Sequence, residues 1–154
     1  MKIEEKVVSL LKDKKMHISF AESCTGGLAA ARLVNVPDAS EVFDMGFITY
    51  ANEAKVKIIG VSPDMIEKHG VVSCEVAAGM AEGAAKTAGA EVGVGISGIA
   101  GPSGGTDKKP VGTVCFGFYV NGDTVTYCEH FGNIGRNNVR EKSVGFVFER
   151  LAEL

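Results

Sequence analysis

The 154-residue chain has a formal net charge of −3 at pH 7, 45% hydrophobic residues, 23% charged residues and 20 glycines. A chain of this length can bury a core without disulfides or a structural metal, and its charge balance argues against a nucleic-acid-binding protein. No apolar stretch approaches the roughly 18 residues of a membrane-spanning helix, and charges interrupt the first fifteen residues. We therefore expect one cytoplasmic domain over residues 1–154 that acts without a membrane or nucleic-acid partner.

Segments with helical and strand periodicity alternate along the chain. Helices are predicted over residues 2–14, 28–36, 52–60, from Ser62-Pro63 onward, 75–89 and 139–154. Strands are predicted over residues 17–20, 42–50, 92–99, 111–120 and 124–131, with the last two joined by a turn at Asn121-Gly122-Asp123. This alternation predicts an α/β fold, a three-layer α/β/α sandwich with a mixed sheet.

One glycine pattern has the spacing of a dinucleotide-binding motif. Gly93, Gly95 and Gly98 form a G-x-G-x-x-G. A Rossmann fingerprint needs these glycines between a strand and a helix, with an acidic residue about 20 positions later. Here the glycines lie inside a predicted strand and a proline-containing loop follows, so we reject a dinucleotide site.

A longer glycine-rich segment, from Gly95 to Thr113, begins inside that strand and continues through the loop after it. Glycines allow close approach of a ligand to the main chain, and successive N–H groups in such turns bind anions. A connecting loop without a ligand explains the same composition equally well.

The sequence AESCTGG, residues 21–27, lies at a predicted strand-to-helix junction. A serine there faces the amide donors of a helix N-terminus, which suit a developing oxyanion. Ser23 or Thr25 could instead cap the helix, which is the more common role of such residues, and Cys24 is an alternative nucleophile. Either nucleophile needs a base, and the loop contains no histidine that could act as one.

The sequence TYANEAK, residues 49–55, offers a base that is not histidine. A lysine acts as a general base only when burial or a nearby cation lowers its pKa far below about 10.4. Tyr50 and Lys55 could form a catalytic set without histidine, although a solvated lysine and a strand tyrosine are the commoner explanation.

Arg136 and Arg140 are one helical turn apart and could bind a phosphate or carboxylate, or pair with Glu141 or Glu149.

The four cysteines, at positions 24, 74, 115 and 128, lack the paired spacing of a zinc site. We expect them to be reduced and mostly buried. The cysteine spacing argues against a zinc site, and we expect no metal and no cofactor.

Together, AESCTGG, TYANEAK, the segment from Gly95 to Val114 and the late R-x-x-x-R resemble the CinA C-terminal domain family, the nicotinamide-nucleotide amidases. The resemblance implies an α/β/α sandwich that hydrolyses the carboxamide of nicotinamide mononucleotide to nicotinate mononucleotide and ammonia, without a metal. It also implies a homo-oligomer, a dimer. Longer members carry a further N-terminal domain linked to ADP-ribose pyrophosphatase activity, and we expect that activity to be absent here.

By this resemblance Ser23 is the nucleophile, Lys55 the general base and Tyr50 an assisting tyrosine. We expect N–H groups near Gly26 and Gly27 to form the oxyanion hole and Arg140 to contact the substrate phosphate. The full set of expected substrate-binding residues is Thr25, Gly26, Gly27, Asn52, Ser97, Gly98, Gly101, Gly105, Thr106 and Arg140. The alternatives are a non-catalytic nucleotide-binding module that uses the glycine-rich loop and a structural domain that acts through oligomerisation.

Overall fold

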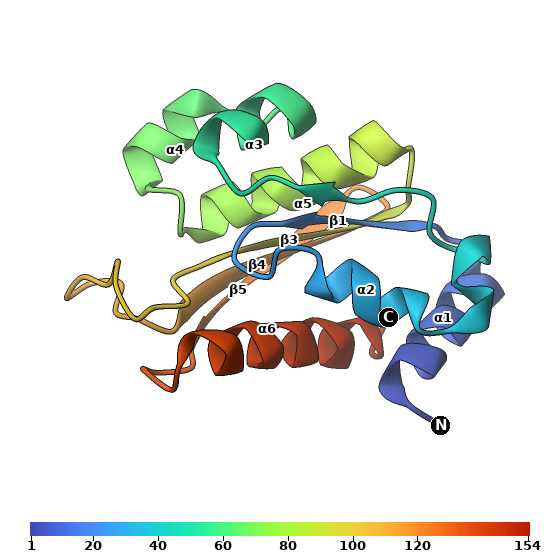
Figure 1. Ribbon diagram of the computed structural model, residues 1–154. Helices are drawn as coiled ribbons and strands as arrows, with labels where there is room; N and C mark the ends of the chain where they lie inside the picture. Colours follow the sequence, from blue (N-terminus) through green and yellow to red (C-terminus); the bar gives the residue numbers. More distant parts are fainter.

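The computed structural model describes residues 1–154 and has a five-stranded mixed sheet with helices on both faces (Figure 1). The strand order is β2-β1-β3-β4-β5, in which β1 is parallel to β2 and β3, and β4 is antiparallel to β3 and β5. The strands are β1 (Ile18–Glu22), β2 (Phe47–Ile48), β3 (Val92–Gly98), β4 (Thr113–Val120) and β5 (Asp123–His130). The predicted α/β sandwich with a mixed sheet is confirmed.

Two groups of helices cover the two faces of the sheet (Figure 1). One face carries α1 (Ile3–Lys14), α2 (Leu28–Val34), the short 3-10 helix η1 (Pro37–Glu41) and α6 (Arg136–Leu151). The other face carries α3 (Asn52–Ile59), α4 (Pro63–His69) and α5 (Cys74–Ala88). The larger hydrophobic core lies on the α1–α2–α6 side, and a smaller one lies between α3, α5 and the sheet.

Local sequence signals account for most of the helix boundaries. Gly60 and Gly89 end α3 and α5 with φ of 70° and 66°, the left-handed conformation that favours glycine. The hydroxyls of Ser62 and Ser73 accept hydrogen bonds from backbone N–H groups at the starts of α4 and α5. The helix end expected at residue 60 and the helix start expected at Ser62-Pro63 are confirmed.

The chain between η1 and α3 contains much less strand than the sequence predicts. Residues 42–50 were expected to form one strand, but β2 is only Phe47–Ile48, with an isolated bridge from Phe43 to Ile18. The segment runs along the sheet edge, where β1 is its only neighbour, and the Ser19 hydroxyl binds the carbonyl of Met45. Its apolar residues serve packing, since Val42 is buried and Phe43 packs edge-on against Phe20.

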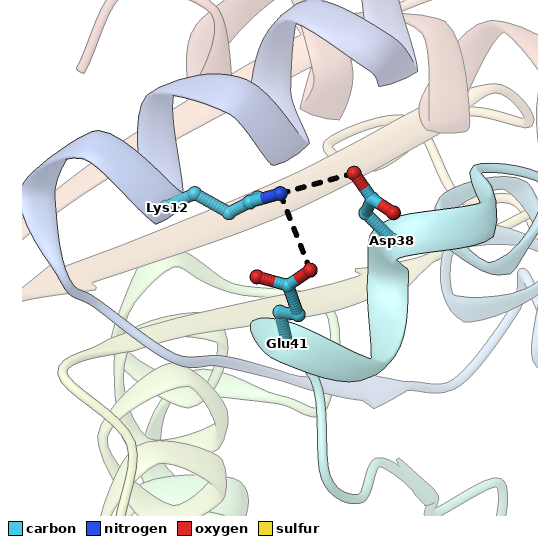
Figure 2. Close-up of polar contacts among 3 residues, drawn as sticks. All are labelled: Lys12, Asp38 and Glu41. Carbon is cyan, nitrogen blue, oxygen red and sulfur yellow. Dashed lines mark hydrogen bonds and ion pairs between the residues drawn. The ribbon is translucent and has the colours of Figure 1, made fainter.

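An ion-pair cluster joins α1 to η1 on the same side of the sheet. Figure 2 shows Lys12 Nζ between the carboxylates of Asp38, at 3.0 Å, and Glu41, at 3.3 Å. The hydrogen bond to Asp38 and, to a smaller extent, the one to Glu41 raise the pKa of Lys12. The cluster is exposed, so its contribution to stability is small and is screened by salt.

Three strand glycines allow α5 to lie unusually close to the sheet. A Cβ at Gly93 would overlap the carbonyl oxygen of Ala81, and one at Gly95 or Gly117 would overlap that of Ala77. Alternate residues of β3 point into the larger core instead. The G-x-G-x-x-G pattern thus lies within a strand, as predicted, and its first two glycines serve helix packing.

We expect Gly95→Ala to destabilise the protein by about 1–3 kcal/mol, because the added methyl group forces α5 away from β3. Gly145→Ala in α6 is the matched control, since nothing lies within 4 Å of the added methyl. That substitution should raise stability by roughly 0.5–1 kcal/mol through lower chain entropy. Urea unfolding of both variants measures the difference, and equal stabilities would contradict the packing argument.

Candidate active site

The candidate site lies where the three parallel strands end at the same edge of the sheet. Ser23 follows β1, Thr49 and Tyr50 follow β2, and Gly98 ends β3. The Ser23 N–H donates to the carbonyl of Ile96, so the start of the loop extends the β1–β3 ladder. The chain runs from β1 to β2 on one side through α2 and η1, and then returns to β3 on the other side of β1 through α3, α4 and α5 on the opposite face. The carboxyl ends of β1 and β3 therefore form the crevice where open α/β sheets bind ligands.

Ser23 and Lys55 are 32 positions apart in sequence and are brought into contact here. Lys55 Nζ lies 3.1 Å from Ser23 Oγ, 2.5 Å from the carbonyl oxygen of Thr49 and 3.2 Å from that of Tyr50. Lys55 is fully buried on α3 and has no acidic partner in an ion pair. Burial lowers its pKa from 10.5 to about 8.

The three partners of Lys55 suit a neutral amine. A neutral amine has two N–H groups and one lone pair, and a carbonyl oxygen can only accept a hydrogen bond. When protonated, Lys55 Nζ donates to both carbonyls and to Ser23 Oγ. Once it is neutral, its two N–H groups still satisfy the carbonyls of Thr49 and Tyr50, and its lone pair faces the Ser23 hydroxyl. In this form Lys55 is already placed to take the proton of Ser23.

Cys24, the alternative nucleophile, has a less suitable environment. Its side chain is buried, and that burial raises its thiol pKa from 9.0 to about 11. Since the thiolate is the reactive form of cysteine, the thiol of Cys24 is unreactive near neutral pH. The geometry favours Ser23.

A cavity of about 280 Å³ opens above Ser23. Residues of several segments line it, including the loop after β1, the start of α3, the end of β3 with its following loop, and the start of α6. The lining residues are Ser23, Cys24, Tyr50, Asn52, Val71, Val72, Ser97, Gly98, Ile99, Ala100, Gly101, Ser103, Gly104 and Arg136. Of the expected substrate-binding residues, Asn52, Ser97, Gly98 and Gly101 thus line the cavity.

Tyr50 and Arg136 lie together at the exposed side of this cavity. Arg136 donates one hydrogen bond of 3.0 Å to the Tyr50 hydroxyl and another of 2.8 Å to the carbonyl of Gly101. The contact of Tyr50 with Lys55 is made by its backbone carbonyl, and its phenol is bound to Arg136 instead of Ser23. Arg136 therefore links the wall formed by Tyr50 to the glycine-rich loop.

Arg140 does not line the cavity, which differs from the expectation that it contacts a phosphate. Its guanidinium donates to the carbonyls of Cys24 and Thr25, at 2.9 and 3.1 Å, and to the side chain of Asn137. These contacts engage all three guanidinium nitrogen atoms of Arg140, so little is left for a ligand. Arg136, one turn earlier on the same helix, is the arginine at the cavity, because α6 begins there at the open edge.

Two further expected residues, Gly105 and Thr106, lie on the other side of the glycine-rich loop. They line a neighbouring cavity of about 580 Å³, which shares Ser103 and Gly104 with the cavity above Ser23. The Thr106 hydroxyl accepts a hydrogen bond from the N–H of Lys109, so it stabilises a turn within the loop. A ligand in the cavity above Ser23 would contact Gly105 and Thr106 only by extending over Ser103 and Gly104.

The loop after β1 offers backbone donors without partners. The N–H groups of Cys24, Thr25 and Gly27 make no hydrogen bond within the chain, whereas that of Gly26 donates to the carbonyl of Ser23. The Thr25 hydroxyl is also buried without a partner. Gly26 and Gly27 have φ of 56° and 106°, which lets the loop turn sharply into α2.

Glu22 supports this loop, and the sequence interpretation did not include it. Its carboxylate is buried and accepts hydrogen bonds of 2.9 and 3.0 Å from the N–H groups of Ala29 and Ala30 in α2. It thereby holds the residue before Ser23 against the first turn of the helix. A conspicuous acidic residue inside an apolar strand was the available signal.

Histidine, cysteine, aspartate and glutamate side chains nowhere form a group of three suited to a metal ion. None of the helices has both the length and the apolar character needed to cross a bilayer.

The CinA C-terminal domain matches the chain over residues 1–154. A CinA-like protein of Kosmotoga olearia is 50% identical over 96% of the chain, and one of Thermotoga maritima is 48% identical over 97%. These stretches are 35% and 36% of the two relatives, so the chain spans about a third of the curated relatives it matches.

Solved structures agree with the sequence comparison. The competence/damage inducible protein CihA of Agrobacterium tumefaciens superposes with a TM-score of 0.92 at 38% identity, covering 97% of this chain and 93% of that one. A CinA superfamily protein of Escherichia coli superposes with a TM-score of 0.92 at 36% identity, covering 99% of this chain and 91% of that one. The chain is therefore a member of the CinA C-terminal domain family.

Proposed function

We propose that this protein is an amidase that hydrolyses the carboxamide of nicotinamide mononucleotide to nicotinate mononucleotide and ammonia. The observation that carries the proposal is the contact between Ser23 Oγ and the buried Lys55 Nζ, at 3.1 Å, at the base of a cavity. A hydroxyl paired with a base of lowered pKa is the arrangement that nucleophilic catalysis of acyl transfer requires.

The chemistry follows from the protons at this pair. Neutral Lys55 removes the hydroxyl proton while Ser23 Oγ attacks the carboxamide carbon, giving a tetrahedral oxyanion. The protonated lysine then donates that proton to the departing nitrogen, so ammonia leaves and an acyl-enzyme remains. Water, deprotonated by the same lysine, attacks the acyl carbon, and Ser23 leaves with the proton from Lys55.

The unpartnered backbone N–H groups of Cys24, Thr25 and Gly27 are the donors that we assign to the oxyanion. Preorganised backbone donors stabilise such an intermediate without reorganisation during the reaction, and each is worth roughly 10²–10³ in rate. Glu22 and Arg140 contribute indirectly, because they fix α2 and the loop carbonyls that orient these donors.

The phosphate of the substrate is assigned to the open side of the cavity. Arg136 supplies a guanidinium there, and the glycine-rich loop supplies backbone N–H groups around Ser103 and Gly104. A fork of guanidinium donors suits a phosphate. Tyr50 contributes its carbonyl to Lys55 and its ring to the cavity wall, beside Asn52.

Incubation of the purified protein with nicotinamide mononucleotide, followed by an assay for ammonia and for nicotinate mononucleotide, tests the proposal. Nicotinamide riboside, which has the same carboxamide but no phosphate, is the matched comparison. We expect turnover of the nucleotide and much weaker turnover of the riboside. Saturable binding of the nucleotide without product would identify a non-catalytic binding module instead.

We expect Arg136→Ala to raise KM for nicotinamide mononucleotide by roughly tenfold to a hundredfold, because it removes the guanidinium that we assign to the phosphate and a hydrogen bond to a charged group is worth about 1.5–3 kcal/mol. The variant should affect nicotinamide riboside much less, since that compound has no phosphate. Steady-state kinetics with both compounds separates the two effects. An equal loss with each would mean that Arg136 acts only by holding Tyr50 and Gly101 in place.

A further inference from the structure

A second group of reactive side chains lies outside the candidate active site, beside the start of α5. Three of the four cysteines, Cys74, Cys115 and Cys128, line one cavity of about 390 Å³ together with His130. The amidase chemistry uses none of them. All four cysteines of the chain are free thiols.

Cys115 and Cys128 face each other directly across two antiparallel strands. They are register partners in β4 and β5, and their sulfur atoms are 3.9 Å apart. The neighbouring N–H of Phe131 donates to the carbonyl of Gly112, which makes 112–131 a hydrogen-bonded pair. Pairs alternate along an antiparallel ladder, so 115–128 is a non-hydrogen-bonded pair.

This type of pair brings the two Cα atoms to about 4.5 Å, at the short end of the range that a disulfide spans. The sulfur atoms need to approach by about 1.9 Å to reach a bonding distance near 2.05 Å. Side-chain rotation supplies such a movement without a change in strand register. The two thiols are therefore placed to form a bond with each other.

The two thiols differ in accessibility. Cys128 lies on the edge strand and is exposed, whereas Cys115 is covered by Val72 and Ala77. Burial raises the pKa of Cys115, and the adjacent Cys128 adds to that effect. An oxidant from solvent thus meets Cys128 first.

His130 is oriented to accept the proton of Cys128. The Thr113 hydroxyl donates its only proton to the carbonyl of Pro110, at 2.7 Å, so its 3.2 Å contact with His130 Nδ1 requires an N–H on that nitrogen. Neutral His130 then carries its lone pair on Nε2, which lies 3.9 Å from Cys128 Sγ.

We propose that Cys128 and Cys115 are a redox-active dithiol that forms a reversible cross-strand disulfide, with Cys128 reacting first and His130 accepting its proton. With a peroxide as oxidant, His130 takes the thiol proton while Cys128 sulfur attacks one peroxide oxygen and the O–O bond breaks. Cys128 becomes a sulfenic acid, and the departing oxygen takes the proton from His130.

In the second step Cys115 sulfur attacks Cys128 sulfur. The S–S bond forms, the S–O bond breaks, and the leaving hydroxide takes the Cys115 proton to become water. For hydrogen peroxide the sum is two thiols plus one peroxide giving one disulfide and two waters. The thiols lose two electrons and the peroxide gains them, and a dithiol reductant restores the starting state by disulfide exchange.

The test treats the reduced full-length chain with hydrogen peroxide and follows free thiols, intact mass and proteolytic peptides. We expect free thiols to fall from four to two, a mass loss of two hydrogen atoms, and a linked pair of peptides containing Cys115 and Cys128. Dithiothreitol should reverse all three changes. Retention of four thiols, or oxidation of Cys128 to sulfinic acid without a linked peptide, would overturn the proposal.

Single variants identify the partners. Cys128→Ser, at an exposed position that tolerates substitution, and Cys115→Ala should each abolish the linkage. Cys74→Ser, the matched control in the same cavity, should leave it intact. A disulfide that is lost in Cys74→Ser but kept in Cys115→Ala would show that the partner of Cys128 is Cys74 and would overturn the proposal.

His130→Gln should slow formation of the disulfide by roughly tenfold to a hundredfold. A positioned base typically accelerates a reaction by about a hundredfold or more, so this effect is at or below the lower end of that range. The same variant should still reach two free thiols at long times, because it retains both cysteines. An unchanged rate would overturn the role of His130. These readouts do not depend on amide hydrolysis, so they remain interpretable if the proposed amidase activity fails.

Discussion

Ser23→Ala is expected to lower the rate of ammonia release from nicotinamide mononucleotide by about 10⁴-fold or more, because removal of a nucleophile disables every step that passes through the acyl-enzyme. The substitution removes one oxygen from a half-buried position, so the cavity and the fold should persist. Binding of the substrate should change little. Single-turnover kinetics and a binding isotherm together measure both quantities.

Cys24→Ala is the companion variant, since Cys24 lines the same cavity and is the alternative nucleophile. It should retain most of the activity, because burial keeps its thiol protonated near neutral pH. The reverse pattern, with activity lost in Cys24→Ala and kept in Ser23→Ala, would show that the nucleophile is the cysteine.

The pH dependence of kcat/KM should report the titration of Lys55. A general base acts only when deprotonated, and burial lowers the pKa of Lys55 to about 8. Activity should therefore rise with pH up to about 8 and then level off, and it should be roughly a hundredfold below the plateau two pH units lower. A lysine with an ordinary pKa would shift this rise to about pH 10.

Lys55→Met tests the same assignment, because methionine retains much of the volume but none of the basicity. We expect activity to fall by roughly 10³-fold and the rise near pH 8 to disappear. Lys57→Met, at an exposed position of the same helix, is the matched control and should behave as the wild type. A retained pH rise in Lys55→Met would mean that another group titrates.

The fold was predictable wherever the sequence carries a local signal. Helix caps at Gly60 and Ser62, the Asn-Gly turn between β4 and β5, and the alternation of helices with strands all appear in the structure. The structure of the segment 42–50 was not predictable, because its β-branched and aromatic residues follow the same pattern whether they pair with a strand or pack against the core. Only the sheet order shows that this segment has a single neighbour.

The site was predictable for residue types and less so for their partners. The pattern of residues 49–55 drew attention to Lys55, but its acceptors include two backbone carbonyls, which leave no trace in residue identity. Arg136 and Arg140 share one helical spacing, yet they differ in their distance from the start of α6. That difference places the first at the cavity and the second under the Ser23 loop.

The carbonyls that hold Lys55 also bear on how this site can be altered. No side-chain substitution can delete a main-chain acceptor, so the lysine keeps two of its three contacts whatever residue stands at position 50. The Tyr50 side chain meanwhile forms part of the cavity wall. If the protein is the amidase proposed above, saturation mutagenesis at this position is expected to change which amides it accepts, while both carbonyl contacts of Lys55 remain.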